Sequence, residues 1–382
     1  MENYKRYALK KPLRVLIMQA PRAIINGYLK RRTERGREMK AGVFYSKNDL
    51  RIEDIPKPSP KKDEVLIKVM ACGICGTDVH IFKGDKGCFP TPAGTVLGHE
   101  FSGVVEEVGE DVKAIKPGDR VCVDPNKLCN ECYYCKSGIG HFCENMIGIG
   151  TSVNGGFAEY CAVPQSQVYR IADTTTFEMA AMTEPVACCV HGIDLCGISC
   201  GDTVAIIGGG MIGMIMLQLA KISGAGKLIM IEPVEAKRKI AERLGANLTI
   251  DPINEDVHAV LARNQIDRIS TVIECVGKTV TVEQAIDIAG KNSTVMMFGL
   301  TAPDDTITVK PFELFQKEIV LKASFINPYT QKRALELIDG RRIDVSSIVY
   351  AYEPLERLPE ILANDKERAN GKFIILPQGE NK

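Results

Sequence analysis

The spacing of hydrophobic and polar positions changes once along the chain, close to residue 200. From Met39 to about Ala180, short apolar runs alternate with turns that contain Gly or Pro, and this pattern predicts a mainly β region. The clearest strands are expected at 65–69, 101–105 and 120–123. A helix over about 176–196 follows, and it leads into a second region with a different pattern.

In that second region, apolar strand-like runs alternate with helical patterns, as in βαβ units. Strands are expected at 203–207, 227–232, 248–250, 270–275, 294–298 and 320–325. Helices are expected to begin near Met211, Glu235, Glu255, Thr281 and Tyr329. The pattern predicts an α/β fold with a doubly wound parallel sheet over about 189–327.

The tail after residue 327 contains a helical run at 331–338 and a strand-like end at 372–376. A domain inserted near the end of a β-rich domain would leave such a tail to return to the first domain. We therefore expect a β-rich domain made of 39–188 and 328–382, with a ligand cleft against the parallel-sheet domain.

Length and composition are those of a globular protein with two domains: 382 residues, 45% hydrophobic and 25% charged. No run of about 18 apolar residues is present, so we expect no membrane span. The chain holds 14 cysteines, and no leader pattern precedes them. We therefore expect free thiols and a cytoplasmic protein.

The N-terminal 38 residues are strongly basic. They hold eleven Lys or Arg and three acids, a balance of +8, so the rest of this formally neutral chain carries −8. Such an arm is typical of nucleic-acid binding, membrane-surface binding or organelle import, but most often it is a solvated tail. Because a folded domain is expected to begin near Met39, we favour the solvated tail, or a start codon placed too early, over a nucleic-acid or membrane partner.

Four cysteines lie close together in one predicted loop. Their spacing is C-x2-C-x2-C-x7-C, at Cys129, Cys132, Cys135 and Cys143. Four thiolates complete a tetrahedral Zn²⁺ site and leave no open position, which predicts a structural zinc. An iron–sulfur cluster is the alternative, but a ferredoxin run has a three-residue final gap followed by Pro, whereas here the gap is seven residues and Glu144 follows.

A second set of residues has the chemistry of an open zinc site. Cys75, His99 with Glu100, and Glu184 supply a thiolate, an imidazole and carboxylates. Glu184 is informative because a carboxylate within an apolar helix is costly unless a charge or a metal pairs with it. We expect Cys75 and His99 to bind the metal directly, with Glu100 and Glu184 sharing the remaining positions. A carboxylate-rich site leaves Mn²⁺ or another divalent ion open as an alternative.

Thr77 and His80 follow the candidate thiolate and form a candidate proton relay. A hydroxyl two residues after the thiolate can accept a hydrogen bond from the substrate alcohol, and an imidazole that titrates near neutral pH can pass the proton to solvent. We therefore expect Thr77, His80 and Glu184 to be catalytic.

The turn between the expected strand 203–207 and the next helix has the spacing G-x-G-x-x-G, at Gly208, Gly210 and Gly213. In this context the pattern predicts a dinucleotide pyrophosphate site. Glu232 closes the next strand, where an acid binds the ribose 2′-hydroxyl and repels a 2′-phosphate, so NAD is favoured over NADP. Cys275 and Gly299, near the ends of later strands, are further candidate cofactor-binding residues.

From Met39 onward the chain resembles the zinc-dependent medium-chain dehydrogenase/reductase family. The shared motifs are Gly98-His99-Glu100 with Gly103 and Gly109, Gly118-Asp119-Arg120-Val121, Gly155 to Tyr160, the four-cysteine loop and the glycine turn. The resemblance implies a GroES-like catalytic domain, a Rossmann domain, catalytic and structural zinc at the positions named above, and homo-oligomers, dimers or tetramers, formed partly through the cofactor domains.

Within this family, Glu184-Pro185 and the segment 324–330 are similar to polyol dehydrogenases of the arabinitol and polyol-phosphate type. Sorbitol dehydrogenases have an aromatic residue where Ile81 stands and an Arg-Tyr pair where Ile326-Asn327 stands. We therefore expect an NAD-dependent oxidoreductase that converts a secondary hydroxyl of a polyol, or of its phosphate, to the ketose. The alternatives are a dehydrogenase of the threonine or butanediol type and a non-catalytic protein that binds zinc and nucleotide.

Overall fold

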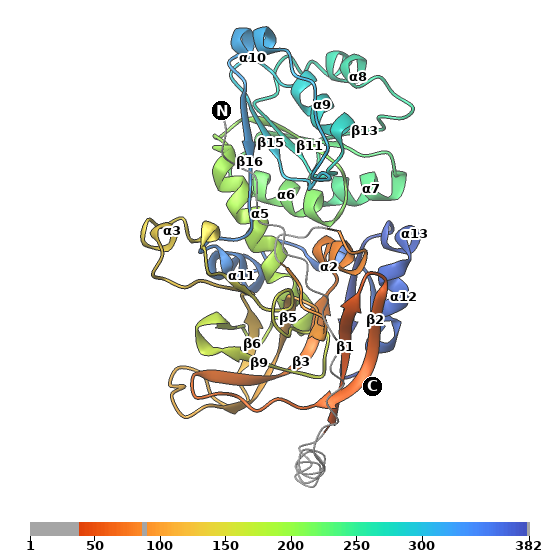
Figure 1. Cartoon of the computed structure of the whole chain (residues 1–382). Helices are drawn as coiled ribbons and strands as arrows, with labels where there is room; N and C mark the ends of the chain where they lie inside the picture. The colour runs from red at the N-terminus through yellow and green to blue at the C-terminus, as the bar shows by residue number, and fades with distance from the viewer. Residues whose placement is uncertain (1–37, 86–89, 380–382) are drawn as a thin grey trace, which may run out of the picture. The chain divides into compact units, whose positions relative to one another are not determined.

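The computed structural model describes residues 38–85 and 90–379 (Figure 1). The predictions about the basic arm concern residues 1–38 and lie outside the described residues, apart from Glu38. From Met39 onward the described residues belong to one compact unit. Within these ranges, no helix combines the length and the apolar character needed to cross a bilayer.

The region that precedes residue 175 is built from β-strands, as expected. The larger sheet has the order β10-β6-β5-β3-β18-β17, and β9 also pairs with β3. Its strands are β3 (Glu64–Gly73), β5 (Glu100–Val108), β6 (Arg120–Val123), β9 (Tyr160–Pro164), β10 (Val168–Arg170), β17 (Val349–Pro354) and β18 (Lys372–Leu376). Smaller sheets are formed by β1 (Glu38–Ser46), β2 (Asp49–Pro56) and β4 (Thr95–Val96), and by β7 (Asn126–Lys127) with β8 (Ile147–Gly148).

The C-terminal tail returns to this sheet. Strand β18 has the predicted bounds and pairs antiparallel with β3, where Ile374 lies opposite Gly73. On its other side, β3 pairs with β5, and Gly73 lies opposite Glu100. The start of β18 is therefore brought next to the start of β5, although the two strands are far apart in sequence.

The second region forms the expected parallel sheet, in the order β13-β12-β11-β14-β15-β16. Its strands are β11 (Thr203–Ile207), β12 (Lys227–Ile231), β13 (Leu248–Ile250), β14 (Thr271–Glu274), β15 (Thr294–Met297) and β16 (Val320–Ala323). The helices between them are α6 (Met211–Ile222), α7 (Glu235–Leu244), α8 (Val257–Arg263), α9 (Thr279–Asp287) and α10 (Pro311–Lys317). The predicted α/β fold is confirmed, whereas the predicted domain boundaries stay predictions.

Several helix starts differ from the sequence expectation by two residues. Helix α8 begins at Val257, because the side chain of Asp256 accepts a hydrogen bond from the backbone N–H of Ala259 and so caps the helix. Helix α9 begins at Thr279, and α11 (Gln331–Asp339) begins two residues after Tyr329. The expectation of a helix was correct in each case, and the first turn was misplaced.

The single helix expected over 176–196 is wrong. The structure has α4 (Phe177–Ala181) and α5 (Thr183–Cys196), separated at Met182. Pro185 explains the break, because a proline lacks the backbone N–H and its ring clashes with the carbonyl one turn earlier in a continuous helix. Proline is tolerated in a first turn. The break therefore places Glu184 in the first turn of α5.

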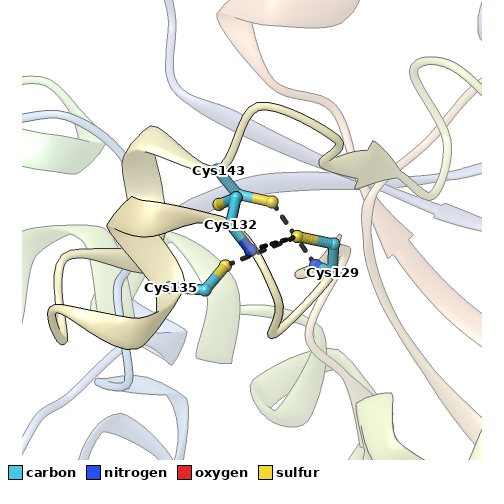
Figure 2. Close-up of side chains that lie close together, drawn as sticks. All are labelled: Cys129, Cys132, Cys135 and Cys143. Atoms are coloured by element: carbon cyan, nitrogen blue, oxygen red, sulfur yellow. Dashed lines mark hydrogen bonds between the residues drawn. The ribbon is translucent and has the colours of Figure 1, made fainter.

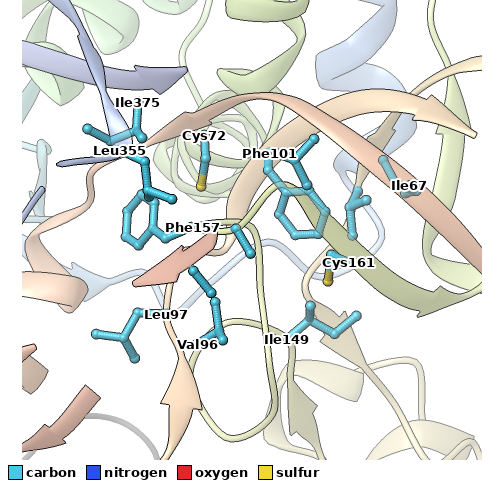
Figure 3. Packing of buried hydrophobic residues seen from close by; sticks show 14 of the residues in the cluster. Ile67, Cys72, Val96, Leu97, Phe101, Ile149, Phe157, Cys161, Leu355 and Ile375 are labelled. Atoms are coloured by element: carbon cyan, nitrogen blue, oxygen red, sulfur yellow. The ribbon is translucent and has the colours of Figure 1, made fainter. Parts of the chain in front are cut away.

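The core of the β-rich region is apolar and closely packed. The rings of Phe101 and Phe157 are almost completely buried, at 1% and 0% exposure. Figure 3 shows them among side chains from β3, β4, β9 and the C-terminal tail. A second buried cluster joins α5 and α6 to β11. Both cores give the loops at their edges a rigid support.

Candidate active site

The four cysteines of the loop between β7 and β8 lie together (Figure 2). Their sulfur atoms are all within 4.8 Å of one another, in the set Cys129, Cys132, Cys135 and Cys143. The backbone N–H groups of Glu131 and Cys132 donate to the sulfur of Cys129, at 3.5 and 3.4 Å, and lower its pKa. Four converging sulfurs, one already supported as a thiolate, fit a closed tetrahedral metal site.

A second group contains a sulfur, a nitrogen and an oxygen. The ligand atoms of Cys75, His99 and Glu100 lie within 4.8 Å of one another. Cys75 directly precedes α2 (Gly76–Phe82), and Glu100 opens β5. His99 and Glu100 are buried, and Glu100 Oε1 has no hydrogen-bond partner in the described part of the chain. Buried polar atoms without partners are costly, and this donor set is one that Zn²⁺ accepts, so the residues fit a metal.

Asp78 contacts Cys75 and His99 of this group, and it was not predicted as a site residue from the sequence. Its carboxylate is fully buried, accepts a hydrogen bond from the backbone N–H of Cys75 at 2.8 Å, and lies 3.4 Å from His99 Nδ1. Burial alone would lower the pKa of His99, but Asp78 and Cys75 outweigh it and raise that pKa well above its usual value. The acid at the third position of a helix, after Cys75, is a capping-box pattern that could have revealed it.

Lys372, at the start of β18, forms a buried ion pair with Glu100. Its ammonium group also donates to the carbonyl oxygen of Ile74 at 2.8 Å, and only 4% of the residue is exposed. Opposite Glu100 on β3 is Gly73, where a Cβ atom would come within 2.3 Å of Glu100 Oε2. One oxygen of Glu100 is thus held by Lys372, while the other faces no described partner.

Glu184 lies near Cys75, His99 and Glu100, but it does not belong to the set whose ligand atoms lie within 4.8 Å of one another. Its Oε1 accepts a hydrogen bond from the thiol of Cys188, one helical turn later, at 3.4 Å. Burial raises the pKa of Glu184 to about 7, while the charge of His99 opposes this shift and that of Glu100 adds to it. The structure therefore places Glu184 within electrostatic reach of the group and gives it a partner of its own.

Thr77 and His80 both lie on α2 and line one cavity of about 630 Å³. Gly277 and Leu300, from loops that follow β14 and β15, line the same cavity. His80 Nδ1 is 3.1 Å from a carboxylate oxygen of Asp85, and the imidazole is partly exposed. The candidate relay therefore connects a cavity to solvent.

The glycine turn after β11 has the conformation that a close phosphate approach requires. Gly208 has φ +100°, and a Cβ atom on Gly213 would lie 1.8 Å from the carbonyl oxygen of Gly208. Gly210 stands directly before α6, so the N-terminus of this helix faces the turn. Because these three glycines carry no side chain, a ligand can approach the backbone of the turn closely.

Glu232 follows β12 and lies against the glycine turn. Its Oε2 accepts a hydrogen bond from the backbone N–H of Gly209 at 2.6 Å, and its Oε1 from that of Val234 at 2.9 Å. Cys275 follows β14, and its backbone N–H donates to the carbonyl of Ile207 at 2.9 Å. The sequence candidates for the cofactor therefore lie along the carboxyl ends of neighbouring strands, where such sheets bind ligands.

Gly299 follows β15 and belongs to the same edge. Its backbone N–H donates to the carbonyl of Glu274 at 2.9 Å. Glu274 itself ends β14 and is completely buried, and no motif in the sequence points to it. The apolar pattern of this strand alone does not mark Glu274 as a functional residue.

A cavity of about 330 Å³ connects the candidate metal group to the glycine turn. Its lining includes Cys75 from the first region, Gly210 and Met211 from the second, and Lys372 from the tail. The candidate thiolate and the candidate phosphate site therefore share one cavity.

Two family models match the chain in the order of its two regions. Residues 61–173 match the alcohol dehydrogenase GroES-like domain. Residues 212–340 match the zinc-binding dehydrogenase domain. The described four-cysteine loop and the glycine turn are consistent with this order.

Relatives match over most of their length. An L-threonine 3-dehydrogenase of Caldanaerobacter subterraneus is 35% identical over 86% of this chain and 95% of its own. A D-arabitol-phosphate dehydrogenase of Enterococcus avium is 35% identical over 85% and 92%. A solved structure from Sinorhizobium meliloti, described as a zinc-binding dehydrogenase bound to NADP, has a TM-score of 0.86 and 37% identity and covers 89% of this chain and 100% of its own. The chain is therefore a member of the zinc-dependent medium-chain dehydrogenase/reductase family, within the alcohol dehydrogenase superfamily.

Proposed function

We propose that this enzyme oxidises a secondary hydroxyl of a polyol, or of a polyol phosphate, with NAD as hydride acceptor, and forms the ketose. The observation that carries the proposal is the cavity that Cys75 shares with Gly210 and Met211. An alcohol held beside the thiolate would then share this cavity with a cofactor bound at the glycine turn. Direct hydride transfer requires alcohol and cofactor to lie close together.

Cys75 and His99 would hold a catalytic zinc, with Glu100 and Glu184 available for its remaining positions. When bound, zinc supplies a Lewis acid that lowers the pKa of an alcohol. Asp78 orients His99, and Lys372 restrains one oxygen of Glu100. Cys129, Cys132, Cys135 and Cys143 would hold the second, structural zinc.

Thr77 and His80 would carry the proton. The Thr77 hydroxyl lines the same cavity as His80 and can accept a hydrogen bond from the substrate hydroxyl. His80 then passes the proton to solvent, because its imidazole is partly exposed and is oriented by Asp85. These steps use only side chains that the described cavity brings together.

NAD is proposed over NADP because of the charges around Glu232. Its carboxylate lies at the end of β12 and would repel a 2′-phosphate. The nearby cation, Arg238, is 3.2 Å from a carboxylate oxygen of Asp251 and donates to the carbonyl of Glu232, so it is already engaged. The Sinorhizobium neighbour binds NADP, so the preference needs a direct test. Glu232→Ser should bring the kcat/KM values for NAD and NADP closer together, and an unchanged ratio would contradict the proposal.

The polyol assignment is supported by the D-arabitol-phosphate dehydrogenase relative and by Glu184-Pro185. The L-threonine 3-dehydrogenase relative, equally identical, favours an amino alcohol as the second candidate. A panel of pentitols, hexitols, their phosphates, threonine and 2,3-butanediol, each with NAD, tests both. Turnover of threonine alone would overturn the polyol proposal. If no compound of the panel is turned over, the non-catalytic binding protein becomes the leading hypothesis.

A homo-oligomer is proposed as well, and two exposed features of the cofactor region support it. Strand β16 is an edge of the parallel sheet, and its Val320 is 48% exposed. On α10, Phe312 and Phe315 are 67% and 77% exposed. Exposed apolar groups beside an open strand edge are typical of an association surface. Light scattering that shows a monomer at micromolar concentration would contradict this proposal. A cytoplasmic location stays a prediction.

A further inference from the structure

Glu274, at the carboxyl end of β14, is a completely buried carboxylate with a one-sided set of partners. Its Oε1 accepts hydrogen bonds from the backbone N–H groups of Val276 and Gly277, at 2.7 and 2.9 Å, and from the hydroxyl of Thr281 at 2.7 Å. Its Oε2 has no donor among the described residues. Since removing a carboxylate from water is costly, this residue needs an explanation beyond packing.

The contacts of Glu274 join the loops that follow two adjacent strands. The side chain holds the 275–277 loop through its N–H groups, and the backbone carbonyl accepts hydrogen bonds from Phe298 and Gly299 at 2.9 Å each. Gly277 and Leu300, which belong to these loops, line the cavity that contains Thr77 and His80. Glu274 therefore lies behind one wall of the proposed reaction cavity.

Two glycines show how closely the loops approach. A Cβ atom on Gly299 would lie 2.2 Å from the backbone nitrogen of Gly277 and 2.7 Å from Glu274 Oε2. A Cβ atom on Gly277 would lie 2.4 Å from the carbonyl oxygen of Leu300. The two loops are thus in backbone contact, and the carboxylate of Glu274 is at the contact.

The same loop also reaches the glycine turn. A Cβ atom on Gly208 would lie 2.6 Å from a methyl carbon of Val276, which Glu274 holds by its N–H. Displacement of the 275–277 loop would therefore move both the cavity wall and the support of the proposed pyrophosphate site.

We propose that Glu274 is a positioning residue for the nicotinamide cofactor, which sets the spacing of the 275–277 and 299–300 loops around the reactive end of NAD. The inference rests on the proposed function, because only a bound nicotinamide cofactor gives these loops a ligand to position. One oxygen of Glu274 accepts hydrogen bonds from three donors that would otherwise bind water. Loss of this oxygen would therefore break all three hydrogen bonds at once. The second loop is held by the backbone carbonyl of Glu274, which accepts from Phe298 and Gly299.

The test compares Glu274→Ala with Glu274→Gln and with the matched control Asp287→Asn, an exposed carboxylate on α9. NADH affinity is measured by fluorescence titration, and KM is measured separately for NAD and for the alcohol. Glu274→Ala should weaken NADH binding about tenfold or more, since it removes three hydrogen bonds. It should raise KM for NAD and leave KM for the alcohol unchanged. Glu274→Gln keeps an acceptor oxygen and should stay within about threefold of wild type, like the control.

Thermal unfolding separates positioning from a purely structural role. A structural role would lower the melting temperature of Glu274→Ala and leave the NADH affinity of the folded enzyme unchanged, and that result would overturn the inference. Equal losses in Glu274→Gln and Glu274→Ala would overturn it as well. If Glu274→Ala does not fold, Thr281→Val removes one of the three donors and should weaken NADH binding about threefold. A wild-type enzyme that binds no NADH would instead refute the proposed function.

Discussion

The two groups of candidate metal ligands are assembled in different ways. The four cysteines lie between residues 129 and 143 in one loop, and three of them are only partly buried. Cys75, His99 and Glu100 come from the start of α2 and from β5, and two of the three are buried. Asp78 and Lys372 hold the second group in place. The first group is local, whereas the second depends on the packing of three segments.

This difference in assembly matches a difference in chemistry. The four sulfurs of the cysteine loop converge on one point and would fill all four positions of a tetrahedral ion, which suits a structural metal. The second group mixes sulfur, nitrogen and oxygen, and its buried Glu100 Oε1 has no hydrogen-bond partner in the described chain. A site of this kind can accept an additional ligand, because three protein ligands leave one tetrahedral position open.

The largest expected effect comes from the mixed group. Cys75→Ala should reduce kcat/KM about 10³-fold, because a Lewis acid contributes several kcal/mol to such a reaction and each 1.36 kcal/mol is a factor of ten. Steady-state kinetics with the best polyol of the panel measure it. Cys200→Ala, at an exposed cysteine outside both groups, is the control and should behave like wild type. Residual activity above a tenth would show that Cys75 is no ligand.

The cysteine loop should affect stability more than catalysis. Cys132→Ser should lower the free energy of unfolding by about 3 kcal/mol, because a structural zinc contributes to folding directly. Zinc per chain, measured by atomic emission, should fall by about one. The kcat/KM of the remaining folded enzyme should change little. A loss of activity as large as that of Cys75→Ala would remove the distinction between the two groups.

Asp78 tests whether the mixed group needs its support. Asp78→Asn keeps an acceptor oxygen for the Cys75 N–H but removes the negative charge that faces His99. We expect metal affinity, measured by chelator competition, to fall about 10–100-fold, as for other residues that orient a metal-binding histidine. Wild-type metal affinity in Asp78→Asn would mean that Cys75, His99 and Glu100 keep their positions without the charge of Asp78.

The smallest effect concerns the strand that leads into the cysteine loop. Burial raises the pKa of Asp124 to about 6, above its usual value of 3.8. The folded state therefore binds more protons than the unfolded state between these values, and stability falls as the pH rises through about 6. Asp124→Asn should remove this decrease, so that the variant loses less stability than the wild type between pH 4 and pH 7.

Chemical unfolding across this pH range measures that change. Asp173→Asn, at an exposed aspartate, is the control. An unchanged pH profile in Asp124→Asn would place the pH dependence elsewhere, for example in the metal groups themselves.

Sequence patterns predicted the regular parts of the fold well. The strands at 203–207, 248–250 and 372–376 have the predicted bounds, because an apolar run between turn residues is a local signal. The helix over 176–196 failed at Met182, where Pro185 interrupts the hydrogen bonding. Helix α10 was not predicted, because a helix of seven residues is too short to establish a helical period in the sequence.

Site residues divide in the same way. Cys75, His99, Thr77, His80 and the glycine turn could be named from short motifs. Asp78 could have been named from the capping-box pattern after Cys75 but was not. Lys372 and Glu274 could not, because their roles depend on neighbours that the motifs do not include. Lys372 is 272 residues from Glu100, and no local pattern relates the two.

By itself, the sequence determined the kinds of atoms available: four thiols in one loop, a thiol and an imidazole in separate motifs, and a glycine turn after a buried strand. Only the tertiary structure decided that Glu100 stands with Cys75 and His99 while Glu184 pairs with Cys188, and that Glu274 joins two loops. The reason is physical. Ligand type is a property of each side chain, whereas the distance between side chains from remote segments is set by how strands and helices pack against one another.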